Sequence, residues 1–285
     1  MRILKAKEKN FELLKQFVLP YEISCMQLCA HIKQKSENIF VVVNDEKLCA
    51  LCDIYGVFYF DGSMHHCLPF LTENELLYSE FAAVFMNFLD KQKKPLKYLN
   101  GQAESTRKIL EFLNNAGIKP YQDNLYFLMI LKTPAILPPV KLMNDDFIKH
   151  CSKNDREELF DLQKKYLMEE VAPKGKKLSD AECSLILDGI LKNQICSALV
   201  SDGKFVSKVN TNAVGWNFIQ IGGVYTEPIY RRNYYAWHLI YELCEMILKK
   251  NKNVSLFVKE NNSVAFDLYK KIGFLPVGRF EICYF

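Results

Sequence analysis

The feature that most constrains the fold is a pattern that occurs twice along the 285 residues. A strand-like run, a polar turn and a second run occupy residues 39–52, and the same succession occupies residues 195–209. The turn aspartates, Asp45 and Asp202, are 157 positions apart (202 − 45). A helical pattern that ends at a glycine also occurs twice, and these glycines are 156 positions apart (273 − 117). Because the two offsets agree within one residue, the sequence indicates a duplicated domain.

Each half predicts helices, a hairpin, a further strand, a long helix, a strand, a helix and final strands. The second hairpin has a strong Asp-Gly turn signal. The long helices are expected at residues 73–91 and 234–250, and strands at residues 125–130 and 280–285 close the two halves. The predicted fold class is therefore α/β (a mixed α+β sheet): two tandem domains, each a mixed, mostly antiparallel sheet flanked by helices.

A proline-marked stretch divides the halves. Because proline fixes φ and lacks the N–H that a sheet needs, residues 134–139 are predicted to be a linker. The predicted domains are residues 1–133 and residues 140–285.

Composition and charge exclude several classes of protein. The chain is mildly basic, with a net charge of +4, and its lysines are scattered with short clusters that are typical of solvated loops, so no nucleic-acid groove is predicted. The ten cysteines lie in a long chain without a signal peptide or a membrane-length apolar run, which favours reduced thiols in a cytoplasmic protein. Cys49 and Cys52, with His65, His66 and Cys67 downstream, predict no metal site, because residues three apart in a strand point to opposite faces.

The stretch at residues 220–236 carries the strongest functional signal. It begins as a strand, breaks at Pro228 and then opens the second long helix. A helix N-terminus presents backbone N–H groups without intrahelical partners, at the positive end of the helix dipole. With Arg231 and Arg232 beside it, this terminus is suited to bind a pyrophosphate.

This stretch resembles the phosphate-binding motif of the GNAT superfamily of acyltransferases, Arg/Gln-x-x-Gly-x-Gly/Ala, which Val-x-Thr-x-Pro commonly precedes. Here the chain has Val224-Tyr225-Thr226-Glu227-Pro228 and then Arg231-Arg232-Asn233-Tyr234-Tyr235-Ala236. Tyr234 replaces the middle glycine, and a Cβ at that position narrows the approach of the backbone to the phosphates. A helical φ would tolerate the side chain, so the replacement weakens the match to the motif without excluding cofactor binding.

A second motif of the same family follows in the right order. The run Asn262-Ser263-Val264-Ala265-Phe266-Asp267-Leu268-Tyr269-Lys270-Lys271-Ile272-Gly273-Phe274 is similar to the signature Asn-x-x-Ala-x-x-Leu-Tyr-x-x-x-Gly-Phe and matches it at every fixed position. The chain thus resembles a tandem GNAT-like N-acetyltransferase whose C-terminal half carries the acyl-coenzyme A motifs.

The resemblance implies direct acyl transfer from acetyl-coenzyme A, as co-substrate, within a ternary complex. The pyrophosphate would lie on the arginine-containing loop, and the pantetheine arm would pair with the preceding strand. The cofactor-binding residues would be Val224, Tyr225, Thr226, Arg231, Arg232, Asn233, Tyr234, Tyr235, Ala236 and Asn262. Asn262 by default also caps the following helix. Tyr269 would protonate the departing thiolate, and a backbone N–H would stabilise the oxyanion.

The sequence leaves the general base open. An attacking amine must be neutral, so the reaction needs a base or a water path. Glu170, with Glu169 beside it, lies on a helical run and is one candidate; Glu281 on the final strand is another. Family members often have a carboxylate on the strand before the motif, where this chain has Gln220, which cannot accept a proton.

The first half lacks both motifs, and Leu113 stands where the offset places the equivalent of Tyr269 (269 − 156). We expect this half to have lost cofactor binding and to shape the acceptor pocket or to support the neighbouring sheet.

The predicted function is transfer of an acetyl group to a primary amine, in a small molecule, an amino acid or a protein, without a membrane, nucleic-acid or metal partner. Two alternatives stay open. One is a non-catalytic acyl-coenzyme A-binding or interaction protein, which Tyr234 and the missing base favour and the intact second motif disfavours. The other is an aminoacyl-tRNA-dependent transferase of the tandem GNAT-like type, which predicts a basic groove and no coenzyme A binding.

Overall fold

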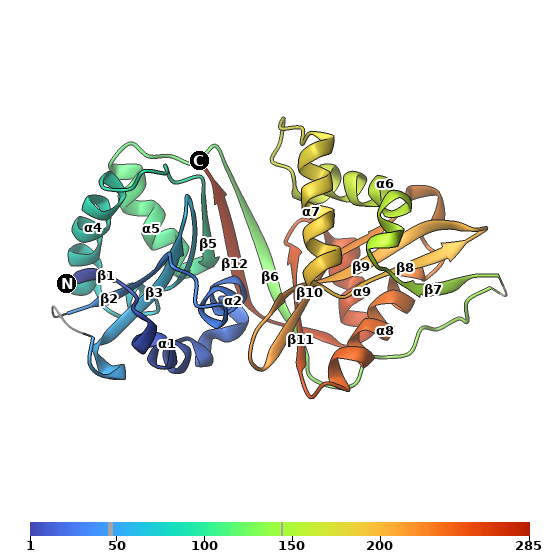
Figure 1. The fold of residues 1–285 in the computed structure, drawn as a ribbon, viewed down its shortest axis with the longest axis horizontal. Coiled ribbons are helices and arrows are strands. Elements are labelled where there is room, and N and C mark those ends of the chain that lie inside the picture. The colour runs from blue at the N-terminus through green and yellow to red at the C-terminus, as the bar shows by residue number, and fades with distance from the viewer. Residues whose placement is uncertain (45–47, 144) are drawn as a thin grey trace. The chain divides into compact units, whose positions relative to one another are not determined.

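The computed structural model describes residues 1–44, 48–143 and 145–285 (Figure 1). The chain forms two compact units. Unit 1 comprises Met1–Leu128 together with Val277–Phe285, and unit 2 comprises Met129–Pro276. The boundaries of the units therefore differ from those of the two halves of the sequence, because the last nine residues belong to unit 1. The domain boundaries predicted at residues 133 and 140 were based on the repeat in the sequence, and they stay a prediction.

Unit 1 is a mixed sheet with helices packed on it. Its strands follow the order β1-β2-β3-β4-β5-β12-β6. Its strands are β1 (Arg2–Lys5), β2 (Ile39–Val43), β3 (Ile54–Phe60), β4 (Ser63–Cys67) and β5 (Tyr98–Gln102), with most of β6 (Gln122–Leu131) and β12 (Phe274–Tyr284). Its helices are α1 (Phe11–Val18), α2 (Met26–Lys33), α3 (Phe70–Glu73), α4 (Glu75–Asp90) and α5 (Ala103–Asn115).

Unit 2 has the same architecture. Its strand order is β11-β10-β9-β8-β7, and only β10 and β11 run parallel among the pairs recorded for it. The strands are β7 (Phe147–His150), β8 (Cys196–Ser201), β9 (Lys204–Val214), β10 (Phe218–Thr226) and β11 (Asn253–Lys259). The helices are α6 (Arg156–Tyr166), α7 (Asp180–Asn193), α8 (Tyr235–Leu248) and α9 (Ser263–Ile272), with a π-helical turn at Leu167–Val171 and a 3-10 turn at Pro228–Tyr230.

The duplication is visible in the strand register. In unit 1, β4 pairs with β5 in parallel, and Ser63 faces Tyr98, 35 positions later (98 − 63). In unit 2, Phe218 of β10 faces Asn253 of β11, again 35 positions later (253 − 218). The equivalent residues of the two units are 155 apart (218 − 63), close to the offset expected from the sequence. The predicted mixed sheets and the tandem arrangement are therefore confirmed.

Of the two predicted hairpins, the structure contains the second as predicted and the first only in part. The second is confirmed as β8–β9, and its turn residues Asp202 and Gly203 have φ of 50° and 71°, as a tight hairpin turn with the right twist requires. The first prediction was wrong in its second strand. Leu51–Asp53 form a 3-10 turn, and the strand that pairs with β2 is β3, at Ile54–Phe60. The turn at residues 45–47 lies outside the described residues.

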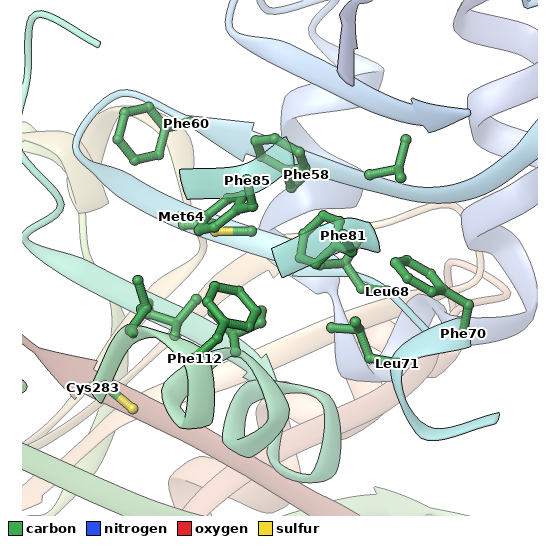
Figure 2. Packing of buried hydrophobic residues seen from close by; sticks show 14 residues of the cluster. Phe58, Phe60, Met64, Leu68, Phe70, Leu71, Phe81, Phe85, Phe112 and Cys283 are labelled. Atoms are coloured by element: carbon green, nitrogen blue, oxygen red, sulfur yellow. The ribbon is translucent and has the colours of Figure 1, made fainter. Parts of the chain in front are cut away.

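Each unit has its own apolar core. Figure 2 shows the core of unit 1, where the rings of Phe58, Phe81 and Phe85 pack together from β3 and α4. In unit 2, α8 packs on β8, β9, β10 and β11 through a buried apolar face that includes Leu239 and Leu243. Among the described residues, no helix has the length and apolarity needed to cross a membrane.

Candidate active site

The parallel pair β10–β11 opens part-way along its length. The recorded pairing runs from Phe218–Asn253 to Ile221–Leu256, although β10 continues to Thr226 and β11 to Lys259. Where this pairing ends, β10 also changes register against β9, between Gly222 and Tyr225. The irregularity is the β-bulge that the Gly-Gly pair suggests. It leaves the backbone of residues 224–226 at the open side of β10.

Only glycine fits the centre of this bulge. Gly223 has φ of 61°, and a Cβ there would lie 1.9 Å from Asn210 Oδ1. Side chains instead hold its backbone: Lys208 Nζ donates to the Gly223 carbonyl at 2.8 Å, and the Gly223 N–H donates to the Tyr166 hydroxyl oxygen. Burial raises the pKa of Tyr166 to about 12 and lowers that of Lys208 to about 8. Lys208 was not predicted as a site residue, although a lysine next to Val209 within a strand-like run is a signal that the sequence carries.

The chain turns sharply between β10 and α8. Arg232 and Tyr234 have φ of 70° and 60°, so two residues of the arginine-containing loop are left-handed. Tyr234 does not have the helical φ that would tolerate its side chain: this residue is the N-cap of α8 and adopts the left-handed conformation that glycine adopts without strain. Tyr234 is 44% exposed, and its ring lies beside that of Trp237, with 6.2 Å between the ring centres. The replacement of the motif glycine therefore stores backbone strain at the helix entrance.

Arg231 is held at the end of β10. Its Nε donates to the Thr226 carbonyl at 3.0 Å, and its guanidinium carbon lies 5.6 Å from the centre of the Tyr225 ring. One terminal nitrogen donates to both oxygens of Glu169, at 2.9 and 3.1 Å. The Glu169 carboxylate is therefore bound to the guanidinium group that the motif would use to bind a phosphate.

The remaining loop residues divide between exposed and structural positions. Arg232 and Asn233 are exposed, and Asn233 Nδ2 donates to the Tyr230 carbonyl at 3.2 Å. Tyr235 is buried, and its hydroxyl donates to Asp146 at 2.7 Å, which anchors the first turn of α8. Ala236 is half-buried behind it. The first intrahelical bond recorded at this end runs from the His238 N–H to the Tyr234 carbonyl, as expected for a terminus whose first N–H groups are open to a ligand.

A second cluster joins the π-helical turn to the start of α9. Asn262 caps α9 through Oδ1, which accepts from the Ala265 N–H at 3.0 Å, and this confirms the default role. Its Nδ2 donates to Glu170 at 3.4 Å, and Lys259 Nζ lies 3.5 Å from the other oxygen of that carboxylate. Tyr269 is buried, and burial, with Tyr166 and Glu170 nearby, raises the pKa of its hydroxyl. The phenol thus stays protonated, which suits a proton donor.

Comparison with known proteins agrees with this geometry. Residues 205–281 match the family model described as FR47-like protein. A Drosophila melanogaster protein of solved structure superposes with a TM-score of 0.70 at 12% identity, over 99% of this chain and 98% of that one. A GCN5-related N-acetyltransferase from Sphaerobacter thermophilus gives a TM-score of 0.61 at 12% identity, over 99% and 94%. An acetyltransferase of the GNAT family from Colwellia psychrerythraea gives 0.57 at 10% identity, over the full length of both chains. The chain has the tandem GNAT fold. A search of curated proteins finds no match.

Within the tandem GNAT fold, the two predicted base candidates separate. Glu170 lies in unit 2 beside Asn262. Glu281 belongs to unit 1, where it faces Gly101 of β5 and forms an ion pair with Arg107 at 3.3 Å. Burial raises the pKa of the Glu281 carboxyl. Unit 2 therefore brings together Glu170, Asn262 and Tyr269, whereas Glu281 belongs to unit 1.

The structure also places the other residues that the sequence singled out. Leu113 lies in the apolar core of unit 1, on α5. Gln220 is buried on β10 and accepts from Asn212 at 3.0 Å. Cys49 and Cys52 are exposed. In the described part of the chain, no three histidine, cysteine, aspartate or glutamate side chains gather as metal ligands would.

Proposed function

We propose that the protein is an N-acyltransferase that moves an acetyl group from acetyl-coenzyme A to a primary amine, by direct transfer in a ternary complex. One observation carries the proposal: the pairing of β10 with β11 ends beside a helix N-terminus that has two arginines in front of it. The opening offers extended backbone for an amide-containing arm, and the helix end offers N–H groups for a diphosphate.

The cofactor would bind in two parts. The diphosphate would lie at the start of α8, near Arg231 and Arg232, and would displace the Glu169 carboxylate from Arg231. The amides of the pantetheine arm would pair with the backbone of residues 224–226, with Asn262 on the other side of the opening.

The chemical step would use two groups of the second cluster. The amine nitrogen attacks the thioester carbonyl carbon, and the carbon–sulfur bond breaks as the tetrahedral intermediate collapses. Glu170 would accept the proton that the amine loses, directly or through water. Tyr269 would give its proton to the departing thiolate. The acceptor class stays a small amine, an amino acid or a protein amine.

A second candidate function is acyl-coenzyme A binding without turnover. The left-handed Tyr234 and the Glu169–Arg231 ion pair favour it, because both oppose tight binding of a diphosphate at the loop. The two candidates differ in whether an amine is acetylated.

Calorimetry of the full chain with acetyl-coenzyme A, followed by mass spectrometry of an amine panel, tests the proposal. We expect measurable binding, competition by coenzyme A and acetylation of at least one amine class. Arg231→Ala should weaken binding about tenfold, because a charge-assisted contact is lost. Arg156→Ala, which removes another partly exposed, ion-paired arginine of unit 2, is the matched control and should change nothing. Absence of heat and of competition for the unmodified chain would refute the proposal; binding without acetylation would favour the second candidate.

A further inference from the structure

Lys208 is a buried charge without a countercharge. It lies on β9 with 0% of its surface exposed, and none of the described carboxylates forms an ion pair with it. Burying an unpaired ammonium costs several kcal/mol in general, and removing the charge is often neutral or stabilising. Packing therefore gives no reason for a lysine here.

The ammonium instead faces dipoles at the bulge of β10. Its Nζ lies 2.8 Å from the Gly223 carbonyl oxygen and 2.9 Å from Asn210 Oδ1, and it sits 4.9 Å from the centre of the Tyr166 ring. The Gly223 N–H donates to the Tyr166 oxygen. Both backbone groups of Gly223 are thus held by side chains, at the point where β10 has left regular pairing.

This arrangement fixes the direction of the next N–H. No described peptide bond is cis, and in a trans peptide the N–H points opposite to the preceding carbonyl. Because the Gly223 carbonyl points toward Lys208, the Val224 N–H points away from Lys208. A cation at the carbonyl oxygen also polarises the peptide and strengthens its N–H as a donor.

We propose that Lys208 is a positioning residue: it holds and polarises the Gly223–Val224 peptide so that the Val224 N–H stabilises the negative charge that develops on the thioester oxygen. This inference rests on the proposed function. During transfer the carbonyl π electrons move onto that oxygen and return when the carbon–sulfur bond breaks. Lys208 itself exchanges no proton with the substrate. A preorganised donor of this kind stabilises the transition state more than the ground state.

The charge of Lys208 gives the inference a pH signature. Burial lowers the pKa of Lys208 to about 8, so the ammonium loses its proton as the pH rises through that value. The titratable groups that face it are Tyr166 from α6, Cys196 from β8 and Cys151 from the segment after β7. Turnover should therefore fall on the alkaline side, while cofactor affinity, set at the loop before α8, should not.

The test compares Lys208→Met with Lys204→Met in the full chain. Lys204 is an exposed residue of the same strand, so its variant removes one charge without touching the bulge. In Lys208→Met, kcat should fall about ten- to hundredfold, less than for removal of a direct oxyanion donor, with acetyl-coenzyme A affinity within about twofold. The alkaline limb of the kcat profile should also disappear. In Lys204→Met, the kcat, the affinity for acetyl-coenzyme A and the alkaline limb of the kcat profile should all be retained. Unchanged kcat, or a loss of affinity that matches the loss of kcat, would overturn the inference.

A second readout does not depend on activity. In the unmodified chain, the amide ¹⁵N and ¹H shifts of Val224 should titrate with the pKa of Lys208, and in Lys208→Met they should not. If the amide chemical shifts of Val224 in the unmodified chain do not change between about pH 7 and 9, the inference is overturned, even if the variant fails to fold. If the unmodified chain binds no acetyl-coenzyme A and acetylates no amine, the proposed function fails, while the Val224 titration still decides whether the lysine polarises this peptide.

Discussion

The ion pair between Glu169 and Arg231 makes a sharp prediction about cofactor affinity. Arg231 is the first residue of the motif, yet its guanidinium already contacts both carboxylate oxygens of Glu169. A diphosphate that uses Arg231 has to displace that carboxylate. Glu169→Gln keeps the size of the side chain and removes its charge, so we expect the variant to bind coenzyme A more tightly.

The exposure of the pair sets the size of the effect. Both side chains are 45% exposed, so solvent screens the pair and it contributes at most about 1 kcal/mol. Removing a competing interaction of about 1 kcal/mol tightens a dissociation constant by about fivefold. The carboxylate also repels the diphosphate, and salt screens that repulsion over roughly 8 Å at 0.15 M ionic strength. The gain should therefore be about three- to fivefold at that ionic strength and smaller near 1 M salt.

Titration calorimetry with coenzyme A at low and high salt measures this gain. Glu157→Gln is the control, since Glu157 is an exposed carboxylate at the start of α6, away from the arginine-containing loop in sequence and with no recorded ion pair in the described structure. The displacement argument is refuted if Glu169→Gln binds with unchanged affinity, or if Glu157→Gln gains as much. Weaker binding in Glu169→Gln would also refute it, because Glu169 would then hold Arg231 in a productive position.

Three further predictions follow from the site and from the core of unit 1. Because Tyr234 is left-handed with φ of 60°, Tyr234→Gly should be about 1 kcal/mol more stable than Tyr234→Ala in chemical denaturation, and equal stability of the two variants would contradict the strain. Tyr269→Phe should lower kcat while leaving the affinity for acetyl-coenzyme A within about twofold, since it removes only the hydroxyl group and keeps the ring; equal turnover would remove Tyr269 from the acid role. Burial lowers the pKa of His65 to about 4 and that of His66 to about 3, against 6.5 for an ordinary imidazole. The unfolded state therefore binds more protons than the folded state below pH 6.5, and the free energy of unfolding should fall as the pH drops from 6.5 toward 4. His66→Gln should flatten that loss in thermal melts between pH 7 and 4, and an unchanged slope would show that the imidazole is not its source.

Local signals predicted the elements whose ends have their own chemistry. The Asp-Gly turn gave the β8–β9 hairpin, because both residues tolerate the left-handed conformation. Asn262 and Gly273 mark the two ends of α9, since the first caps the N-terminal N–H groups and the second accepts a φ of 113°. The bulge at Gly223 likewise coincides with a local signal, the Gly222-Gly223 pair within β10.

Features that depend on contacts between residues distant in the sequence could not be predicted from it. The left-handed φ of Tyr234 follows from the turn between β10 and α8, which overrides the preference of a tyrosine. The inward direction of Lys208 depends on the strand register beside the bulge. The first hairpin was misplaced because residues 48–52 are apolar enough for a strand yet have no strand beside them in the described sheet.

The position of Glu281 has a wider consequence. The segment Val277–Phe285 ends the second half of the sequence but belongs to unit 1, where β12 pairs with β5 from Phe280–Gln102 to Tyr284–Tyr98. A fragment that begins at residue 140 would leave those residues without β5 and would lack Met129–Leu131, which belong to unit 2. The first half therefore has a structural reason to persist without cofactor motifs: it completes a sheet that the last strand of the second half needs. For the same reason the binding and turnover experiments require the whole chain, because a shortened one would lose strand pairing before it lost any residue of the candidate site.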